Sequence, residues 1–268
     1  MKVAGKKFVV TGGGSGMGQE LVLQLLKRGG SVAAVDIRQA GLDETVARAG
    51  EAAERVSTHI ADISDKAAVT KLLGEVLKRH GHIDGLFNNA GVIQPFKKIH
   101  QLDDETIERV MNINFYGTLN MTRTFLPHLL KRPEAHLVNT SSMGGFLPVP
   151  GQAIYGASKA AVKLMSEALY AELLDTNVRV STVFPGAVAT NITQNSGVDI
   201  PASNTGDKGI KALPASEAAE KILDGMEDDD YHILVGSDAY MMDKLSRLMP
   251  EKAVKIIQKQ MKALLPDD

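Results

Sequence analysis

The 268-residue sequence contains no cysteine and no tryptophan, and only 4% of its residues are aromatic. Without cysteine the chain forms no disulfide, no thiolate metal site and no cysteine nucleophile. No apolar run reaches the roughly 18 residues that a membrane-spanning helix needs, and no secretory-type apolar segment precedes Thr11. We therefore expect a soluble, cytoplasmic protein that is not attached to a membrane.

The chain also lacks a strong charge of either sign, because 30 basic residues nearly balance 32 acidic ones. A nucleic-acid-binding protein would normally carry a basic footprint, so this class is not expected. The sequence shows no cluster of His, Asp and Glu with metal-ligand spacing, and we expect no metal. What the chain does have is 44% hydrophobic residues, which is enough for a buried core and argues against disorder.

Short apolar runs alternate with stretches of helical periodicity along nearly the whole chain. This alternation is typical of βαβ units and predicts an α/β fold: a single Rossmann-type, doubly wound parallel sheet of about seven strands flanked by helices. The absence of a linker between halves favours one domain over residues 1–268. The expected strands are Phe8–Val10, Ser31–Val35, Val56–Ile60, Gly85–Phe87, Leu137–Val138, Arg179–Phe184 and Ile233–Val235.

Two predicted helices, 104–131 and 154–175, are apolar around more than one face. A helix that covers one face of a sheet needs only one apolar stripe. The second stripe needs another partner, and we expect that partner to be a second copy of the chain in a homo-oligomer, a dimer or a tetramer. The alternative is that a C-terminal segment covers it.

A glycine-rich turn, Thr11–Gly18, separates the first strand from the first helix. Glycine allows positive φ and lets a ligand approach the backbone, while amides at a helix N-terminus attract a pyrophosphate. The spacing is G-x-x-x-G-x-G at Gly12, Gly16 and Gly18, and the common G-x-G-x-x-G pattern is absent. The turn alone is a weak signal, and plain tight-turn sterics would also explain it.

Asp36, at the end of the second predicted strand, strengthens the case for a dinucleotide site. It follows Gly16 by 20 residues, where a carboxylate would accept hydrogen bonds from an adenosine ribose and repel a 2′-phosphate. These features favour NAD over NADP as cofactor. Arg38, two residues further on, is the main argument for NADP.

Tyr155 and Lys159 stand at i and i+4 on one predicted helical face. A phenol that acts as acid or base near neutral pH needs its pKa lowered by about three units from about 10, and a nearby ammonium supplies roughly that effect. Tyr240 and Lys244 have the same spacing. Only Tyr155 follows a strand that ends at Ser142, so Tyr155 is the candidate and Tyr240 is expected to serve packing.

Taken in order, these segments resemble the short-chain dehydrogenase/reductase family across nearly the whole chain. The segments that carry the resemblance are Thr11–Gly18, Asp36, Asp62–Ile63, Asn88–Gly91, Asn114, Ser142, Tyr155 with Lys159, and Pro185–Thr190. The resemblance implies that Tyr155 is the acid/base and that Ser142 binds the substrate oxygen. It also implies that Lys159 lowers the pKa of Tyr155 and binds the nicotinamide ribose, and that Asn114 helps to hold a water next to Lys159.

The resemblance further implies a set of binding residues. For the cofactor they are Gly12, Gly14, Ser15, Gly16, Met17, Gly18, Asp36, Ile37, Asp62, Ile63, Asn89, Ala90, Gly91, Tyr155, Lys159, Pro185, Gly186, Val188 and Thr190. For the substrate they are Ser142, Gln94, Met143, Gln152, Tyr155 and Ala187, with Ile93, Phe96 and Ile192 nearby. These substrate positions are mostly apolar and contain no Arg or Lys, which indicates a small, uncharged alcohol or ketone.

Two further segments complete the expected architecture. Residues 191–213 are long and weakly periodic, which is typical of a substrate lid. Residues 238–265 carry apolar side chains at helical spacing and predict C-terminal helices over the active site or against another subunit.

We therefore expect an NAD-dependent oxidoreductase that interconverts a secondary alcohol and a ketone by hydride transfer. Two alternatives stay open at this point. A non-catalytic NAD-binding sensor or scaffold would be expected to have lost Ser142, Tyr155 or Lys159, and none is lost. An NAD-dependent epimerase or dehydratase fits the glycine spacing and the length less well.

Overall fold

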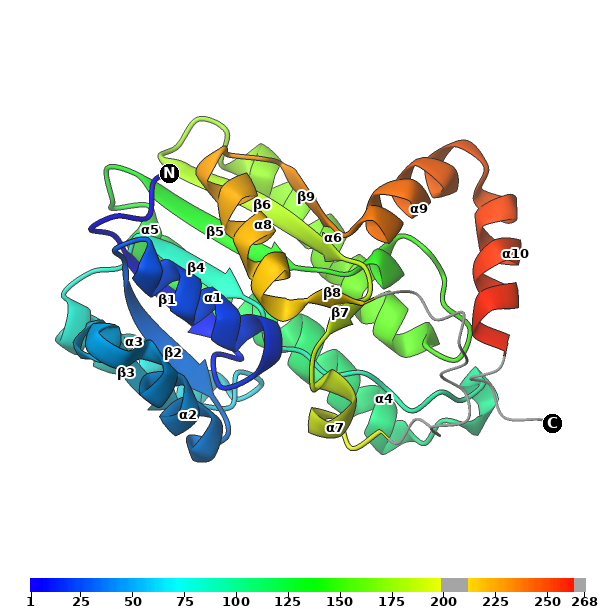
Figure 1. The fold of residues 1–268 in the computed structure, drawn as a ribbon, viewed down its shortest axis with the longest axis horizontal. Coiled ribbons are helices and arrows are strands. Elements are labelled where there is room, and N and C mark those ends of the chain that lie inside the picture. Colours follow the sequence, from blue (N-terminus) through cyan, green and yellow to red (C-terminus); the bar gives the residue numbers. More distant parts are fainter. Residues whose placement is uncertain (199–211, 263–268) are drawn as a thin grey trace.

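Seven parallel strands form the central sheet of the computed structural model, which describes residues 1–198 and 212–262 (Figure 1). The strand order is β3–β2–β1–β4–β5–β6–β9. Strands in the middle of this sheet are buried on both faces, which is why they read as continuous apolar runs in the sequence. The bounds are β1 Lys7–Thr11, β2 Ser31–Asp36, β3 Val56–Ile60, β4 Gly85–Asn88, β5 Ala135–Thr140, β6 Val178–Pro185 and β9 His232–Val235.

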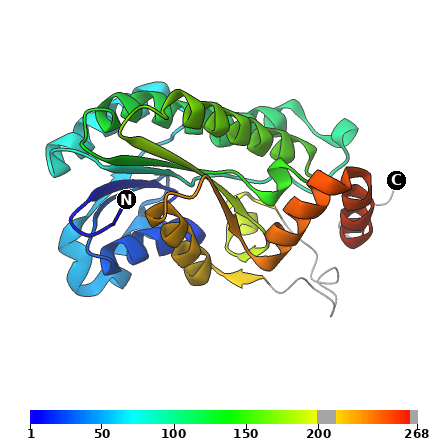
Figure 2. The ribbon, with the colours of Figure 1, turned by 90° about the horizontal axis from the view of Figure 1, so that it is seen from above.

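Helices cover both faces of the sheet, so the molecule has three layers (Figure 2). On one face, apolar side chains of α1 (Gly16–Lys27), α2 (Gln39–Ala49) and α8 (Ala215–Glu227) form a core with the sheet. On the other face, α3 (Lys66–His80), α5 (Thr118–Leu129) and α6 (Ala153–Glu172) form a second core. The predicted doubly wound α/β fold is confirmed.

The helix predicted over residues 104–131 is interrupted. It consists of α4 (Asp104–Met111), a π-helical segment (Asn112–Gly117) and α5. A π-helical turn accommodates an additional residue and is frequent at functional sites. Asn114, in the middle of this segment, is fully buried. Apolar periodicity predicted a continuous helix because it does not detect such a local change of pitch.

The predicted lid and C-terminal helices are partly described. Within 191–213, α7 (Ile192–Asn195) follows β7 (Val188–Ala189), and β7 pairs in parallel with β8 (Leu213–Pro214). Positions 199–211 lie outside the described residues, as do positions 263–265 of the C-terminal prediction. The C-terminal helices are α9 (Ser237–Leu248) and α10 (Pro250–Met261), and they project beyond one end of the sheet (Figure 1).

The topology determines where a ligand can bind. From β1 the chain passes to α1 on one face of the sheet, whereas from the adjacent β4 it passes to the helices on the other face. A crevice forms at the carboxyl ends of two neighbouring strands whose connections diverge in this way. Within the described ranges, no helix is both long and apolar enough to cross a membrane.

Candidate active site

The glycine-rich turn connects the end of β1 to the first residue of α1. Gly12 and Gly16 have φ angles of 71° and 51°, which favour glycine. Gly18 is required for another reason, since a Cβ there would lie 2.1 Å from the carbonyl oxygen of Gly12. The turn therefore passes closely over the start of α1 and leaves the first backbone amides of the helix available to an anion.

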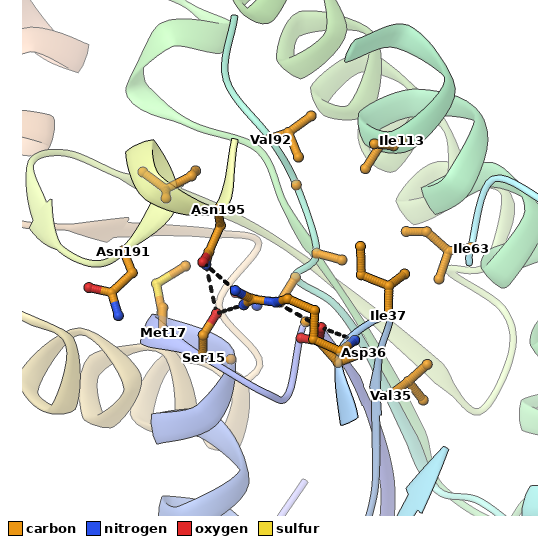
Figure 3. Close-up of a pocket in the computed structure, with 18 of the residues that line it drawn as sticks. Ser15, Met17, Val35, Asp36, Ile37, Ile63, Val92, Ile113, Asn191 and Asn195 are labelled. Carbon is orange, nitrogen blue, oxygen red and sulfur yellow. Dashed lines mark hydrogen bonds and ion pairs between the residues drawn. The ribbon is translucent and has the colours of Figure 1, made fainter. Parts of the chain in front are cut away.

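A cavity of about 230 Å³ opens above this turn (Figure 3). Its walls bring together most of the residues predicted to hold the cofactor. Those on the wall are Gly12, Ser15, Gly16, Met17, Gly18, Asp36, Ile37, Asp62, Ile63, Asn89, Ala90, Gly91 and Thr190. The other predicted cofactor residues (Gly14, Tyr155, Lys159, Pro185, Gly186 and Val188) are not part of the wall.

Asp36 lies at the end of β2 with 9% of its surface exposed. Its carboxylate accepts hydrogen bonds from the backbone N–H of Gly14, at 3.1 Å, and from that of Arg38, also at 3.1 Å. Both carboxylate oxygens therefore hold backbone at the cavity wall. Each oxygen has further lone pairs with which it can accept a hydroxyl.

Arg38 joins the glycine turn to the segment after β7. Its guanidinium donates to the Asn195 side-chain oxygen at 2.6 Å and to Ser15 Oγ at 3.1 Å, and Asn195 Nδ2 donates to the same Ser15 oxygen at 2.9 Å. Figure 3 shows the side chains of Ser15 and Asn195 pointing toward each other. The sequence identified Arg38 only as an argument for NADP, and no sequence signal indicated Asn195. The other wall residues that sequence reasoning missed are Val35, Ala61, Val92, Ile113 and Asn191.

Asn89 presents an unused acceptor at the same wall. Its Nδ2 donates to the Thr11 carbonyl at 3.1 Å, and its backbone N–H donates to Thr11 Oγ1 at 3.0 Å. Its Oδ1 is buried and has no hydrogen-bond partner. Buried polar atoms are normally paired, so this oxygen indicates a ligand that donates a hydrogen bond.

Ser142 and Tyr155 meet at Gly144, where a Cβ would lie 3.5 Å from Ser142 Oγ and 3.3 Å from Tyr155 Cε1. Ser142 follows β5, and Tyr155 occupies the first turn of α6. Burial raises the pKa of Tyr155 above its ordinary value, while a hydrogen bond from Ser142 lowers it. The lowering of the Tyr155 pKa by Lys159 that the resemblance implies stays a prediction.

Lys159 is almost completely buried, at 3% exposure. Its Nζ donates to the Thr140 carbonyl at 2.9 Å, and burial lowers the pKa of Lys159 to about 8. A Cβ built on the wall residue Gly91 would lie 3.2 Å from this Nζ. The ammonium thus lies directly behind Gly91 of the cavity wall, where the missing Cβ leaves room for it.

Asn114 connects the catalytic helix with the loop after β4. Its side-chain amide forms a two-way pair with Val92: Nδ2 donates to the Val92 carbonyl at 2.9 Å, and Oδ1 accepts from the Val92 N–H at 2.8 Å. Nδ2 also donates to Ser158 Oγ at 3.0 Å. These bonds use both polar atoms of the Asn114 side chain, which therefore holds the backbone of Val92 in place. The water-holding role implied by the resemblance stays a prediction.

The loop after β6 is held from the C-terminal helices. Ala187 donates its backbone N–H to the Asp238 carboxylate at 2.7 Å, and Gly186 lies so close to Asp238 that a Cβ would collide with it. Thr190 contacts the glycine turn, because a Cβ on Gly16 would lie 3.1 Å from the Thr190 Cβ. Asp238 was not expected to contribute here.

Two of the predicted substrate residues are buried in the structure. Gln94 is 0% exposed and Gln152 is 4% exposed, and both side chains form hydrogen bonds within the protein. Their contact with substrate stays a prediction. Met143 packs with the C-terminal helices.

Tyr240 also differs from expectation. It is 54% exposed, and its ring lies under Lys244 at 4.3 Å, so it is a surface cation–π pair and is not a buried packing residue.

Comparisons with known proteins agree with this geometry. A family profile described as short chain dehydrogenase matches residues 6–200. The 1-deoxy-11-beta-hydroxypentalenate dehydrogenase of Streptomyces avermitilis is 36% identical over 234 residues, which cover 86% of this chain and 84% of the relative.

Two solved structures share the fold over most of both chains. A short chain dehydrogenase/reductase from Burkholderia phymatum in complex with NAD has a TM-score of 0.84 at 26% identity, covering 94% of this chain and 96% of its own. A short chain dehydrogenase from Burkholderia cenocepacia in complex with NADP has a TM-score of 0.79 at 27% identity, covering 96% and 99%.

Proposed function

Because the chain belongs to the short-chain dehydrogenase/reductase family, we propose that it is an NAD-dependent oxidoreductase that interconverts a secondary alcohol and a ketone. The observation that carries the proposal is that Ser142 and Tyr155 meet at Gly144, where a Cβ would lie 3.5 Å from Ser142 Oγ and 3.3 Å from the Tyr155 ring, while Lys159 lies behind Gly91 of the cavity wall. Ser142 lies just after β5, and Tyr155 and Lys159 lie in the first turns of α6, at the carboxyl edge of the sheet.

The cavity residues fit a nicotinamide dinucleotide. The glycine turn offers amides to a pyrophosphate, Asp36 offers acceptors to a ribose, and the unpaired Asn89 Oδ1 offers a second acceptor to a hydroxyl. When bound, the nicotinamide supplies the hydride acceptor for oxidation and the hydride donor for reduction.

Tyr155 handles the proton. In oxidation its phenolate oxygen accepts the proton of the substrate hydroxyl, and in reduction its phenol donates a proton to the carbonyl oxygen. Ser142 holds the same substrate oxygen and stabilises the phenolate by its hydrogen bond. Lys159, with its pKa near 8, carries a positive charge at neutral pH and favours the phenolate further.

The cofactor preference that we propose, NAD over NADP, depends on Asp36. Its buried carboxylate lies where a 2′-phosphate would bring a second negative charge. Arg38 opposes this preference, but its guanidinium is already shared between Ser15 and Asn195. The substrate that we propose is uncharged and largely apolar, in keeping with the apolar side chains around Met143.

We also propose that the enzyme is a homo-oligomer. Leu164 on α6 is 68% exposed and Tyr116, in the π-helical segment, is 48% exposed, which leaves apolar surface on the two helices with a second apolar stripe. The single-domain organisation and the cytoplasmic location stay predictions.

The direct test is NADH formation from NAD and a panel of secondary alcohols. We expect turnover by the wild type, loss of turnover in Tyr155→Phe by at least about 10³-fold with NAD binding retained, and normal turnover in the matched control Tyr240→Phe. An active Tyr155→Phe variant would refute the mechanism. Tight NAD binding without turnover of any alcohol or ketone would favour the sensor or scaffold.

A further inference from the structure

The loop after β4 is attached to the start of the catalytic helix by one buried side chain. The Oε1 atom of Gln94 accepts hydrogen bonds from two consecutive backbone amides, those of Ile154 at 2.8 Å and Tyr155 at 3.0 Å. Gln94 is 0% exposed. Its side chain therefore pairs with the backbone of the proposed acid/base residue itself.

Two more hydrogen bonds make this attachment reciprocal. Gln94 Nε2 donates to the Gly151 carbonyl at 2.9 Å, and Gln152 Nε2 donates to the Gln94 carbonyl at 2.7 Å. All of these bonds join the loop after β4 to residues 151–155. Leaving one of these buried donors or acceptors unpaired would cost about 1–3 kcal/mol of folding free energy. The four bonds therefore favour the same arrangement of the loop after β4 against residues 151–155.

The N-cap residue of α6 does not itself provide this support. The first amides of an α-helix have no partner within the helix. In α3 and α4 the N-cap residues Asp65 and Asp103 accept such amides with their own carboxylates. In α6 the N-cap residue Gln152 makes no such bond, and Gln94 supplies the acceptor from a different part of the chain.

We propose that Gln94 is a positioning residue that fixes Tyr155 against Ser142 by capping α6 from outside the helix. This inference rests on the proposed function, in which Tyr155 transfers the proton. Tyr155 lies in the first turn, where helices fray, so the place of its phenol depends on whether the first amides are held. The same loop contains Asn89, Gly91 and Val92 at the cavity wall, so Gln94 also links the cavity wall to the acid/base.

The test uses three variants of the full chain. Gln94→Met has a similar length but removes the acceptor. Gln94→Glu retains an oxygen for the two amides and is the conservative variant. Gln19→Met is the matched control, because Gln19 is also buried, at 5% exposure, and donates to Thr45 Oγ1 at 3.1 Å between α1 and α2, away from Tyr155.

Amide hydrogen exchange of Ile154 and Tyr155 measures the proposed bonds without cofactor or substrate. In Gln94→Met we expect exchange at both amides to be faster by at least about tenfold than in the wild type. In Gln94→Glu we expect slow exchange to return, and in Gln19→Met we expect no change at these two amides. Exchange in Gln94→Met equal to that of the wild type would overturn the proposal.

Steady-state kinetics on an alcohol that the wild type turns over supply the second measurement. We expect kcat of Gln94→Met to fall by about 10- to 100-fold, since a displacement of about 1 Å can cost about 10²-fold, with KM for NAD within about twofold. Gln94→Glu should recover most of kcat, and Gln19→Met should keep kcat even if it unfolds at a lower temperature.

An equal loss of kcat in Gln94→Met and Gln19→Met would show a merely structural role and overturn the proposal. An active Tyr155→Phe variant would refute the proposed function instead, and the exchange result would still report whether Gln94 caps the helix. The two failures are therefore distinguishable.

Discussion

One carboxylate, that of Asp36, holds the glycine turn and also faces the proposed ribose site. Its two oxygens accept the amides of Gly14 and Arg38, so the charge is fixed in place by the backbone next to it. Arg38 contributes the opposite charge from the cavity wall, with its Nε 3.7 Å from Asp36 Oδ1. Cofactor selectivity at this site is thus a balance between one acid and one base.

This balance gives a prediction about selectivity. In Asp36→Ala we expect KM for NAD to rise by about tenfold or more, because hydrogen bonds to a charged group contribute about 1.5–3 kcal/mol, and we expect NADP to be accepted better. Adding Arg38→Leu should remove the gain with NADP, because the remaining cation would be gone. The ratio of kcat/KM for NAD and NADP measures both effects, and an unchanged ratio in Asp36→Ala would contradict the prediction.

Local spacing in the sequence is enough to bring Ser142, Tyr155 and Lys159 together, while their roles stay predictions. Tyr155 and Lys159 share a helical face, and Ser142 follows the preceding strand, so their convergence follows from the topology of parallel strands. The structural contacts of Gln94 and Asn195 were missed, because both form hydrogen bonds to residues 57 or more positions away. No periodicity or motif in a single sequence marks such a pair.

At the scale of elements, the C-terminal helices act as a support for the loop after β5. Met242 of α9 and Ala253 and Ile257 of α10 form a small core with Leu147, and Met143 and Phe146 pack against it. This loop begins directly after Ser142. The apolar periodicity of 238–265 predicted helices correctly, but only the structure shows which loop they cover.

Shortening a buried side chain in this core should loosen the loop. We expect Ile257→Ala to destabilise the docking of α10 by about 2–4 kcal/mol, as other buried Ile→Ala changes do, and to raise KM for the alcohol more than KM for NAD. Hydrogen exchange of residues 143–147 and steady-state kinetics measure this. Val254→Ala is the control, because Val254 is 38% exposed and its change should cost within about 0.5 kcal/mol.

At the scale of the whole molecule, a buried histidine lies at the amino end of β5, at the edge of the sheet opposite to the cavity. His136 of β5 is 1% exposed, and Ser181 of β6 lies 2.9 Å from its Nε2. Because the Ser181 hydroxyl donates to the Asp230 carbonyl, its oxygen accepts from His136 Nε2–H. Burial lowers the pKa of His136 to about 3, although Asp229 opposes this shift.

This histidine links the stability of the fold to pH. Between pH 6.5 and pH 3 the unfolded chain binds a proton at His136 that the folded chain does not, so stability falls as pH falls through this range. We expect the wild type to lose about 2 kcal/mol more than His136→Gln between pH 6.5 and pH 5, at 1.36 kcal/mol per pKa unit.

Denaturant unfolding at several pH values measures this difference. His80, whose burial lowers its pKa to about 4, contributes equally to both proteins and cancels in the comparison. Parallel curves of stability against pH would contradict the assignment of the effect to His136.

The π-helical segment between α4 and α5 has a consequence for how this chain tolerates insertions and deletions. Each residue of an α-helix turns its side chain by about 100° around the axis. The wide turn over Asn112–Gly117 therefore sets the rotational phase of α5, and with it the direction of Met121 and Phe125 toward the sheet. Because a π-helical turn accommodates an additional residue, deleting one residue within this segment would let it become α-helical with Met121 and Phe125 still facing the sheet. The same deletion in the first turn of α5 would rotate both side chains by about 100° and turn them off the core.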